Sequence, residues 1–351
     1  MNDLNIYNLL NIYENEVKKN VKNKKRIYNF EKYKIIYITD IYNTLKNNKY
    51  DGGKYNIFII YEPKIRLIMS QNIYDKVINH FTTRYILEPK LTKYLCNNNT
   101  ATRKNMGLSY AIRLLKKYIN KYKNSEFYYL KIDIKKYFYN IDHDVLKELL
   151  IDKLDTNEYN LVSNIIDSTN KSYINDIIDK YNKYDLPKYK LNKGLPIGNQ
   201  TSQFFATYYL YKLHHYIIHN LHLKDIVIYM DDYIIIHKDK EYLKKCLNII
   251  ENKLNKEYKL EINKDKTYIK SSKESINFLG YRFKIKNNKL IVSLSNDTKR
   301  RIIKKIKEKV YLYKNNKISY EILFSSIMNY SNSFIFINKY KIKNIIYKYI
   351  G

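Results

Sequence analysis

Two adjacent aspartates, Asp231 and Asp232, stand between two apolar arms of the chain. Residues 226–230 before them and 233–236 after them are apolar or aromatic and rich in β-branched side chains, which predicts two buried strands joined at an acidic turn. Like charges about 4 Å apart repel by roughly 4 kcal/mol at an effective dielectric of about 20. A divalent cation removes this repulsion, and hard cations such as Mg²⁺ take oxygen ligands. The pair therefore predicts a metal-dependent site, and a solvated turn in an ordinary hairpin is the alternative interpretation.

A third carboxylate ends an earlier apolar run. Residues 128–134 predict a strand that ends near Asp133, followed by Tyr137 and Phe138 and by a helix that starts at Asp142. One carboxylate from each of two neighbouring strand ends can hold two cations. Two metals about 3.5–4 Å apart stabilise the attacking and leaving oxygens of an in-line phosphoryl displacement. The acidic residues thus indicate phosphoryl-transfer chemistry.

The combination of Tyr229-Met-Asp-Asp232 with the Asp133 strand resembles the palm of a reverse transcriptase. The resemblance implies an α/β (α+β) fold shaped as a right hand, with fingers, a palm of antiparallel sheet plus helices, and a short helical thumb. It also implies RNA-directed addition of dNTPs to a primer 3′-hydroxyl by a two-metal mechanism, with two Mg²⁺ per active site and Mn²⁺ as a substitute. Lys266 is the implied proton donor to the departing pyrophosphate, with an ordinary surface lysine as the alternative. The implied metal-site residues are Asp133, Ile134, Asp231 and Asp232.

A basic β-hairpin is predicted upstream, where an Asp-Gly-Gly turn precedes the strand 55–63 and an alternating run from Lys64. This order resembles the fingers of the family. The resemblance implies that Arg66 and Lys64 hold the triphosphate of the incoming nucleotide, because an arginine fork suits phosphate oxygens. A surface hairpin with unrelated charges is the alternative. Arg103, just before a predicted helix at 108–122, resembles a basic residue of the second fingers motif that approaches the template or the nucleotide.

Two further segments resemble parts of the nucleotide pocket. Phe138 lies where the family carries an aromatic ring that excludes a 2′-hydroxyl and so selects deoxynucleotides, and a core phenylalanine is the alternative. The loop 193–203 has glycines on either side of a Pro-Ile turn, so its backbone can approach a base closely. The nucleotide-binding residues implied there are Ile197, Gly198 and Gln203. Most reverse transcriptases carry Gln-Gly and a later Ser-Pro here, whereas Ile-Gly with Ser-Gln resembles the enzymes of diversity-generating retroelements.

The remaining pattern supplies the elements that must position these residues. Asn199 is a predicted N-cap for a helix running to about residue 222, and residues 240–258 predict an amphipathic helix. Residues 277–283 resemble the primer grip, and a hairpin with Asn287-Asn288 at its tip follows. The predicted domains are an N-terminal helical extension (1–50), fingers (51–126), a palm (127–285) with a variable insertion at about 151–190, and a thumb (286–351).

Charge favours a polyanionic partner. The chain has 351 residues with 65 Lys plus Arg against 34 Asp plus Glu, a net charge of +31 that suits nucleic acid. The abundance of Lys, Asn, Ile and Tyr also matches the codon bias of an AT-rich genome, which is an alternative source of part of the lysine. The sequence has no run of about 18 apolar residues and no secretory signal at its start. Cys96 and Cys246 form no metal-spaced motif, so we expect a reduced, cytoplasmic protein without a membrane partner.

The favoured biological role is the reverse transcriptase of a diversity-generating retroelement. The resemblance then implies a template RNA, a nascent cDNA, dNTPs and a small basic accessory protein as partners. A phage-defence or otherwise uncharacterised prokaryotic reverse transcriptase is the second hypothesis. The third is a catalytically idle RNA-binding protein on the same scaffold, against which the intact aspartates argue. Phe138 and the Tyr-Met before the Asp-Asp pair disfavour an RNA polymerase with a similar palm.

Overall fold

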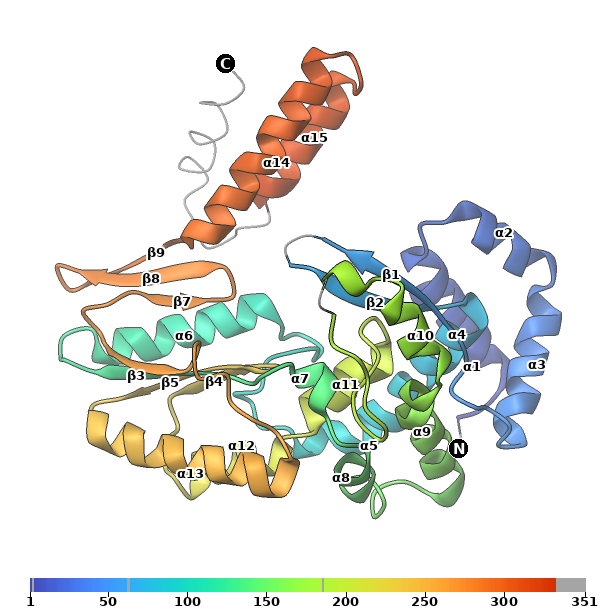
Figure 1. The fold of residues 1–351 in the computed structure, drawn as a ribbon, viewed down its shortest axis with the longest axis horizontal. Coiled ribbons are helices and arrows are strands. Elements are labelled where there is room, and N and C mark those ends of the chain that lie inside the picture. The colour runs from blue at the N-terminus through green and yellow to red at the C-terminus, as the bar shows by residue number, and fades with distance from the viewer. Residues whose placement is uncertain (2, 62–63, 185, 333–351) are drawn as a thin grey trace.

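The computed structural model describes residues 1, 3–61, 64–184 and 186–332, which form a mixed fold of helices and antiparallel sheets (Figure 1). The predicted fold class is therefore confirmed. The helices are α1 (Ile6–Ile12), α2 (Lys24–Lys32), α3 (Lys34–Lys46), α4 (Ile73–Phe81), α5 (Glu88–Leu91), α6 (Leu108–Tyr122), α7 (Tyr137–Asn140), α8 (His143–Glu148), α9 (Thr156–Ile166), α10 (Tyr173–Asp179), α11 (Gln200–Tyr208), α12 (Tyr211–His219), α13 (Lys240–Tyr258), α14 (Asn296–Lys314) and α15 (Tyr320–Asn332). The strands are β1 (Tyr55–Ile60), β2 (Arg66–Gln71), β3 (Tyr128–Asp133), β4 (Ile226–Tyr229), β5 (Asp232–His237), β6 (Tyr268–Ser271), β7 (Ile276–Phe278), β8 (Tyr281–Lys286) and β9 (Lys289–Leu294).

The central sheet has the antiparallel strand order β4-β5-β3-β6. Helix α6 covers one face of this sheet, and α12 and α13 cover the other (Figure 1). Val227 and Ile234 pack in the cluster that contains the apolar side of α6, whereas Ile228 and Ile235 pack in the cluster that contains the apolar side of α13. Because successive strand residues point to opposite faces, a sheet covered on both faces needs near-continuous apolar strands. This requirement explains the apolar arms around Asp231 and Asp232.

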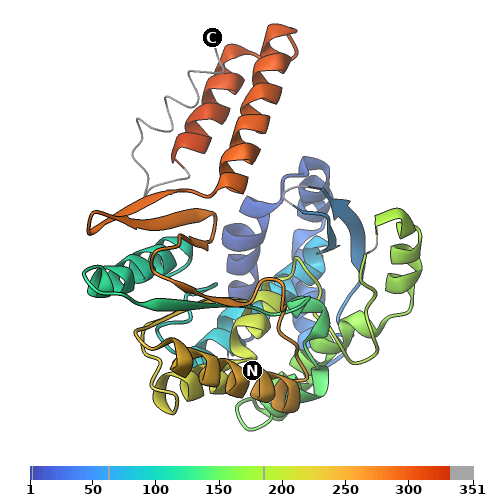
Figure 2. The same ribbon diagram turned by 60° about the vertical axis from the view of Figure 1, so that its left-hand side comes forward.

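A second antiparallel sheet, β7-β8-β9, lies on the far side of α6 and leads into α14 and α15. Asn287 and Asn288 form its tight turn with φ of 49° and 56°, the left-handed conformation that asparagine tolerates best after glycine. The hairpin predicted with these two residues at its tip is therefore confirmed. In Figures 1 and 2, α14 and α15 extend away from the rest of the molecule.

The predicted basic hairpin is also present, as the antiparallel pair β1–β2 in which Ile60 is opposite Arg66. Residues 62–63 of its connection lie outside the described residues. The buried side of the hairpin, with Tyr55, Leu67 and Met69, packs against α10, so a helix of the insertion at 151–190 covers this side of the hairpin. Helix α4 follows at once, and the Asn72 side chain caps it by accepting a hydrogen bond from Asp75 N.

The helix predicted from Asn199 to about residue 222 is wrong in one respect, because it breaks into α11 and α12 at Tyr209 and Leu210. Residues 204–211 are all buried, so no change of periodicity marks the break. Asn199 does hold the N-cap position, but its side chain makes no capping bond and instead donates to Tyr55 Oη at 3.1 Å. The Asn199 side chain thus makes a hydrogen bond to a distant residue in place of a capping bond to its own helix.

The proposed domain boundaries stay predictions, and residues 333–351 of the proposed thumb lie outside the described residues. Helix α14, with its buried stripe Ile302, Ile306 and Val310, lies within the predicted thumb. Among the helices of the described ranges, none is both long and apolar enough to cross a membrane.

Candidate active site

The three aspartates lie at one end of the central sheet. Asp133 is the last residue of β3 and Asp232 the first of β5, and the two are cross-strand partners. Asp231 lies in the β4–β5 turn, where its backbone oxygen accepts a hydrogen bond from Ile134 N at 3.2 Å. The sheet therefore brings together the residues that the sequence singled out, although their catalytic role stays a prediction.

The turn that carries Asp231 is strained. Tyr229 pairs with Asp232, so Met230 and Asp231 are the two central residues of the turn. Such turns require a positive φ at their first central residue, and Met230 takes it with φ of 57° where glycine is usual. A non-glycine residue in this region costs about 1–2 kcal/mol. The Met230 sulfur accepts a hydrogen bond from Thr207 Oγ1 at 3.5 Å, so α11 holds the turn in place.

Burial and mutual repulsion both act on the aspartates. Burial raises the pKa of Asp231, and the nearby Asp133 charge raises it further, while Lys266 and Arg66 act in the opposite direction. Burial raises the pKa of Asp232 to about 6; the Lys131 charge opposes this shift, and Asp231 and Asp133 add to it. A bound cation would favour the charged form of each carboxylate and reverse these shifts.

Two lysines lie against the carboxylates. Lys266 Nζ is 3.3 Å from Asp133 Oδ1, which places the predicted proton donor beside the acidic cluster. Lys131 Nζ is 3.4 Å from Asp232 Oδ1 and also donates to the Asn277 backbone oxygen at 3.3 Å. Sequence reasoning missed Lys131. It lies two residues before Asp133 on the same strand, and this period of two was the available signal, since it puts both side chains on one face.

The donor set fits a hard divalent cation. The Asp232 Oδ1 atom is buried and accepts no hydrogen bond from the described part of the chain, despite the nearby Lys131. Carboxylate oxygens, with a backbone carbonyl such as that of Ile134, are the ligands that Mg²⁺ and Mn²⁺ prefer. Within the described ranges, however, no three His, Cys, Asp or Glu side chains converge as a ready metal site. The chemistry of the residues matches the predicted metals, and their present spacing does not complete a site.

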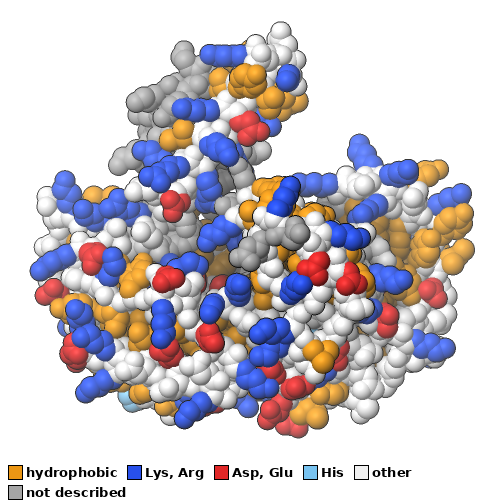
Figure 3. Space-filling model, in the orientation of Figure 1, with side chains coloured by type: hydrophobic (Ala, Val, Ile, Leu, Met, Phe, Trp, Pro, Cys, Tyr) orange, Lys and Arg blue, Asp and Glu red, His pale blue; other side chains and the backbone are white. Residues whose placement is uncertain are grey.

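A cleft of about 1300 Å³ opens over the aspartates. Figure 3 shows a notch in this face between the C-terminal helices and the β1–β2 hairpin, with many Lys and Arg side chains around it. The cleft collects most of the residues predicted from the sequence, namely Lys64, Arg66, Asp133, Ile134, Phe138, Ile197, Asp231, Asp232 and Lys266.

One wall of the cleft joins three chain segments by backbone hydrogen bonds. Phe138, half-buried on α7, accepts a bond from Leu195 N at 2.7 Å. Ile197 accepts one from Met69 N of β2 at 2.9 Å. Phe138 and Ile197 therefore belong to chain segments that are joined to each other, and both residues line the cleft that the aspartates also line.

Three predicted nucleotide-binding residues are not among the residues that line this cleft. The Arg103 guanidinium donates to the backbone oxygens of Cys96 at 2.7 Å and Asn99 at 3.2 Å, so it braces its own loop. Gly198 packs against β2, where an added Cβ would lie 3.1 Å from the Met69 oxygen. Gln203 is exposed on α11. Their nucleotide contacts stay predictions.

Solved telomerase structures align with this chain, and the one with a TM-score above 0.5 supports the fold. Telomerase from Candida tropicalis, in complex with the TWJ fragment of telomeric RNA, aligns over 81% of this chain and 54% of its own, with 13% identity and a TM-score of 0.52. Telomerase from Candida albicans, in complex with the same kind of fragment, aligns over 87% of this chain and 61% of its own, with 17% identity and a TM-score of 0.47. The chain thus spans little more than half the length of these telomerases. No curated protein sequence matches it.

A protein-family model assigns most of the chain. The model described as reverse transcriptase (RNA-dependent DNA polymerase) matches residues 48–283, which include every strand of the central sheet and the three aspartates. The chain therefore belongs to the reverse transcriptase family.

Proposed function

We propose that this protein is an RNA-directed DNA polymerase that adds dNTPs to the 3′-hydroxyl of a primer. One observation carries the proposal: three carboxylates at a sheet end form one side of a cleft that Arg66 and Lys64 also line. Negative charge that can hold metal ions and positive charge that can hold phosphates thus occur in one cavity. This pairing suits a nucleoside triphosphate.

Asp133 and Asp231 are the proposed ligands of two Mg²⁺, with Asp232 in support and Mn²⁺ as a substitute. When bound, such a metal pair stabilises the attacking and leaving oxygens of the displacement. Arg66, whose charge already acts on Asp231, would hold triphosphate oxygens through its planar fork. Lys266 Nζ, beside Asp133, would give a proton to the pyrophosphate oxygen as it leaves.

Phe138 and Ile197 are the proposed selectivity residues. Both line the cleft, from segments joined through Leu195. A ring at Phe138 would fill the space beneath the sugar C2′ and exclude a hydroxyl there. Ile197 would contact the base pair through apolar atoms alone, since its side chain has no donor or acceptor.

A template RNA and its cDNA are the proposed macromolecular partners. The net charge of +31 supports a polyphosphate partner, and α14 contributes a basic helix with one buried stripe and an exposed polar side. The telomerase structure with the similar fold also contains an RNA fragment.

For the biological role we favour a diversity-generating retroelement, because Ile197-Gly198 with Ser202-Gln203 departs from the common pattern in the direction of those enzymes. A small basic accessory protein would then be a further partner. A phage-defence enzyme is the second candidate, because the same two dipeptides also resemble those of close relatives of the retroelement enzymes.

The proposed activity is tested with a DNA primer annealed to a defined RNA template, Mg²⁺ and one dNTP at a time. We expect incorporation only of the dNTP complementary to the next template base, and full extension with all four. Failure to extend any primed RNA, or addition that ignores the template, would refute the proposal.

A further inference from the structure

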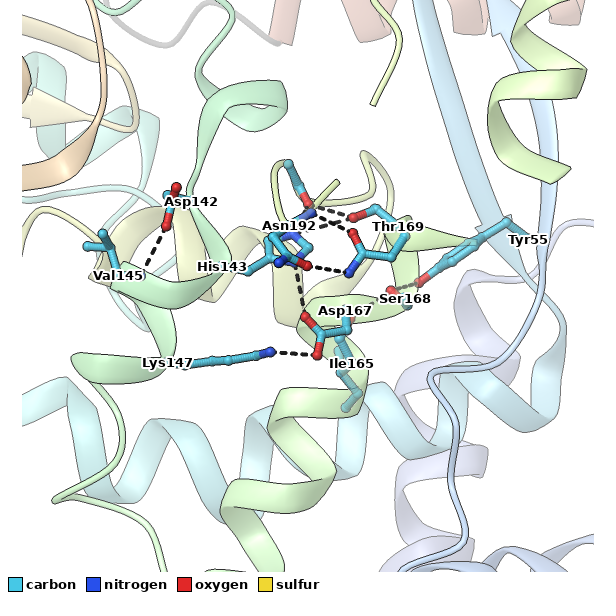
Figure 4. Close-up of polar contacts among 12 residues, drawn as sticks. Tyr55, Asp142, His143, Val145, Lys147, Ile165, Asp167, Ser168, Thr169 and Asn192 are labelled. Atoms are coloured by element: carbon cyan, nitrogen blue, oxygen red, sulfur yellow. Dashed lines mark hydrogen bonds and ion pairs between the residues drawn. The ribbon is translucent and has the colours of Figure 1, made fainter. Parts of the chain in front are cut away.

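Four consecutive polar residues, Asp167 to Asn170, form a short 3₁₀ turn between α9 and α10. Each of the four side chains bonds to a residue outside the turn, and Figure 4 shows these contacts for Asp167, Ser168 and Thr169. The turn is remote in sequence from the aspartates and is not among the residues that line the active-site cleft. Its contacts converge on the segment 192–199, which runs through the cleft wall at Ile197.

The first end of that segment is fixed at the Gly194 carbonyl. Thr169 Oγ1 donates to this oxygen at 2.9 Å, and His143 Nε2 lies 2.8 Å from it. Both side chains are almost fully buried. Gly194 has φ of 90°, and an added Cβ would lie 2.7 Å from the Tyr189 ring, so only glycine fits there. Thr169 and His143 thus both contact one carbonyl, at a position that only glycine can occupy.

His143 is itself fixed by the same turn. Its Nδ1 lies 3.1 Å from Asp167 Oδ1, and Asp167 also pairs with Lys147. The two ring nitrogens thus contact the Asp167 carboxylate on one side and the Gly194 carbonyl on the other, so the ring links the turn to the loop. Burial opposes ionisation of Asp167, but the bonds from His143 and Lys147 outweigh it and lower the pKa of Asp167. The imidazole is therefore held rigidly against Gly194.

The second end of the segment returns to the neighbouring residue of the turn. Asn199 Nδ2 donates to Tyr55 Oη at 3.1 Å, and Tyr55 Oη lies 2.7 Å from Ser168 Oγ. Gly194 and Asn199 are thus tied, directly and through one tyrosine, to the adjacent residues Thr169 and Ser168. The segment between them carries Leu195, which is bonded to Phe138, and Ile197, which is bonded to β2.

We propose that the Asp167–Asn170 turn, together with His143 of α8, positions the loop 192–199 at the nucleotide pocket, with Thr169 and His143 as the main positioning residues. The proposal rests on the polymerase function proposed above and adds the device that sets nucleotide selectivity. A loop that shifts at Gly194 moves Phe138 through Leu195, and it moves Ile197 relative to the aspartates. Its loss should therefore change nucleotide affinity and selection more than the rate of the chemical step.

Thr169→Val tests this with little change of volume, because valine removes the hydroxyl and leaves the contact between His143 and Gly194 in place. We expect the dNTP KM to rise by roughly five- to tenfold and the preference for dNTPs over rNTPs to fall, with kcat nearly unchanged. Thr169→Ser keeps the hydroxyl and should stay within about twofold of wild type. Thr82→Val is the matched control, since Thr82 is equally buried and donates to the Ile78 oxygen inside a different helix.

Hydrogen exchange of the same variants gives a readout that needs no activity. In Thr169→Val the amides of Gly194 and Leu195, which donate to Ile141 and Phe138, should exchange faster, while Thr82→Val leaves them protected. If Thr169→Val does not fold, Asn170→Ala serves instead, because Asn170 holds Asn192 from the surface.

The outcomes separate the two proposals. Unchanged loop exchange overturns the positioning role whatever the activity. If the loop amides of Thr169→Val exchange faster but its dNTP KM and its preference for dNTPs over rNTPs equal those of Thr82→Val, the turn has no effect on nucleotide selection. Faster exchange in a protein whose wild type extends no primer refutes the polymerase function and leaves the anchoring of the loop established.

Discussion

At the scale of single residues, Phe138 offers the sharpest test of substrate choice. Phe138→Ala should open space in the cleft and raise the use of rNTPs, so the ratio of kcat/KM for dNTP over rNTP should fall by about tenfold or more. Phe138→Tyr keeps the ring and is the control. Single-nucleotide incorporation with matched dNTP and rNTP measures the ratio. If alanine leaves the ratio unchanged while dNTP activity is preserved, Phe138 is only a packing residue.

Ile197 is the residue at which fidelity is expected to depart from that of other reverse transcriptases. Apolar contact alone discriminates between similar groups by about 1–3 kcal/mol, whereas directed polar contacts can be stricter. Ile197→Gln should therefore lower misincorporation opposite template adenine more than opposite the other bases. Sequencing of cDNA made from one defined RNA template measures the spectra, with Ile197→Val as the control. Equal misincorporation spectra for the wild type and Ile197→Gln would contradict this hypothesis and favour the phage-defence role.

A residue of the candidate site could be singled out from the sequence only where it belongs to a recognisable motif. The aspartates were singled out because apolar strands flank them, and Phe138 was singled out because the family carries an aromatic ring at this place. Lys131 was missed because one lysine among 65 Lys plus Arg gives no signal by type, and only the strand period singles it out. Arg103 was given a nucleotide contact by resemblance, whereas its guanidinium satisfies two backbone oxygens of its own loop.

At the scale of elements, the N-terminal helices are joined by a charge cluster centred on Glu31. The Lys18 ammonium, opposed by burial and helped by Tyr13 and Lys34, lowers the pKa of Glu31 to about 2. A carboxyl with a depressed folded pKa stabilises the fold above its ordinary pKa and loses that contribution as the pH falls through the folded value. The stabilisation should thus be complete at neutral pH and disappear between about pH 4.5 and 2.

Glu31→Gln is expected to lower the free energy of unfolding by about 1 kcal/mol at pH 7, a modest figure because the cluster is partly exposed. The deficit should shrink toward zero near pH 2. Urea unfolding of both proteins across this pH range measures it. Glu241→Gln, which removes a single exposed pair with Lys244, is the control and should show a smaller effect. A deficit that is the same at pH 7 and at the acid end would contradict the linkage.

Helices with a one-sided apolar face were predictable to the residue, whereas the break inside the fully buried helical segment was not. Helices α6 and α13 match the predicted 108–122 and 240–258 because each alternates a buried stripe with charged positions. The break between α11 and α12 left no trace, since aromatic and apolar residues surround Tyr209 on every side and neither Gly nor Pro marks the kink. The 151–190 insertion resembled a variable connection, yet it contains the turn that holds Gly194.

At the scale of the whole molecule, we expect the net charge of +31 to make the proposed RNA binding depend on salt. For about six phosphate contacts to a single strand, affinity should fall roughly a few hundredfold between about 50 and 200 mM salt. Fluorescence anisotropy of a labelled single-stranded RNA at several salt concentrations gives the slope. Binding that does not respond to salt would mean that the lysine excess reflects codon bias rather than a nucleic-acid surface.

The order of the elements along the chain was predictable, whereas the way they meet was not. The sequence places an acidic strand, a glycine loop and an acidic hairpin in that order, and the family model covers the same span. The contact of Ile197 with β2 and the return of both loop ends to Ser168 and Thr169 join segments far apart in sequence. No local pattern encodes such contacts.

The central claim, that the carboxylates of this cleft perform metal-dependent polymerisation, is tested most directly by Asp231→Asn. Asparagine keeps the size of the side chain and removes one charge. Incorporation of dNTPs on a primed RNA template with Mg²⁺ should fall by about a hundredfold or more, while folding and RNA binding are retained. Asp144→Asn, an exposed change on α8, should leave the rate unaltered. Turnover by Asp231→Asn close to that of wild type would contradict the account.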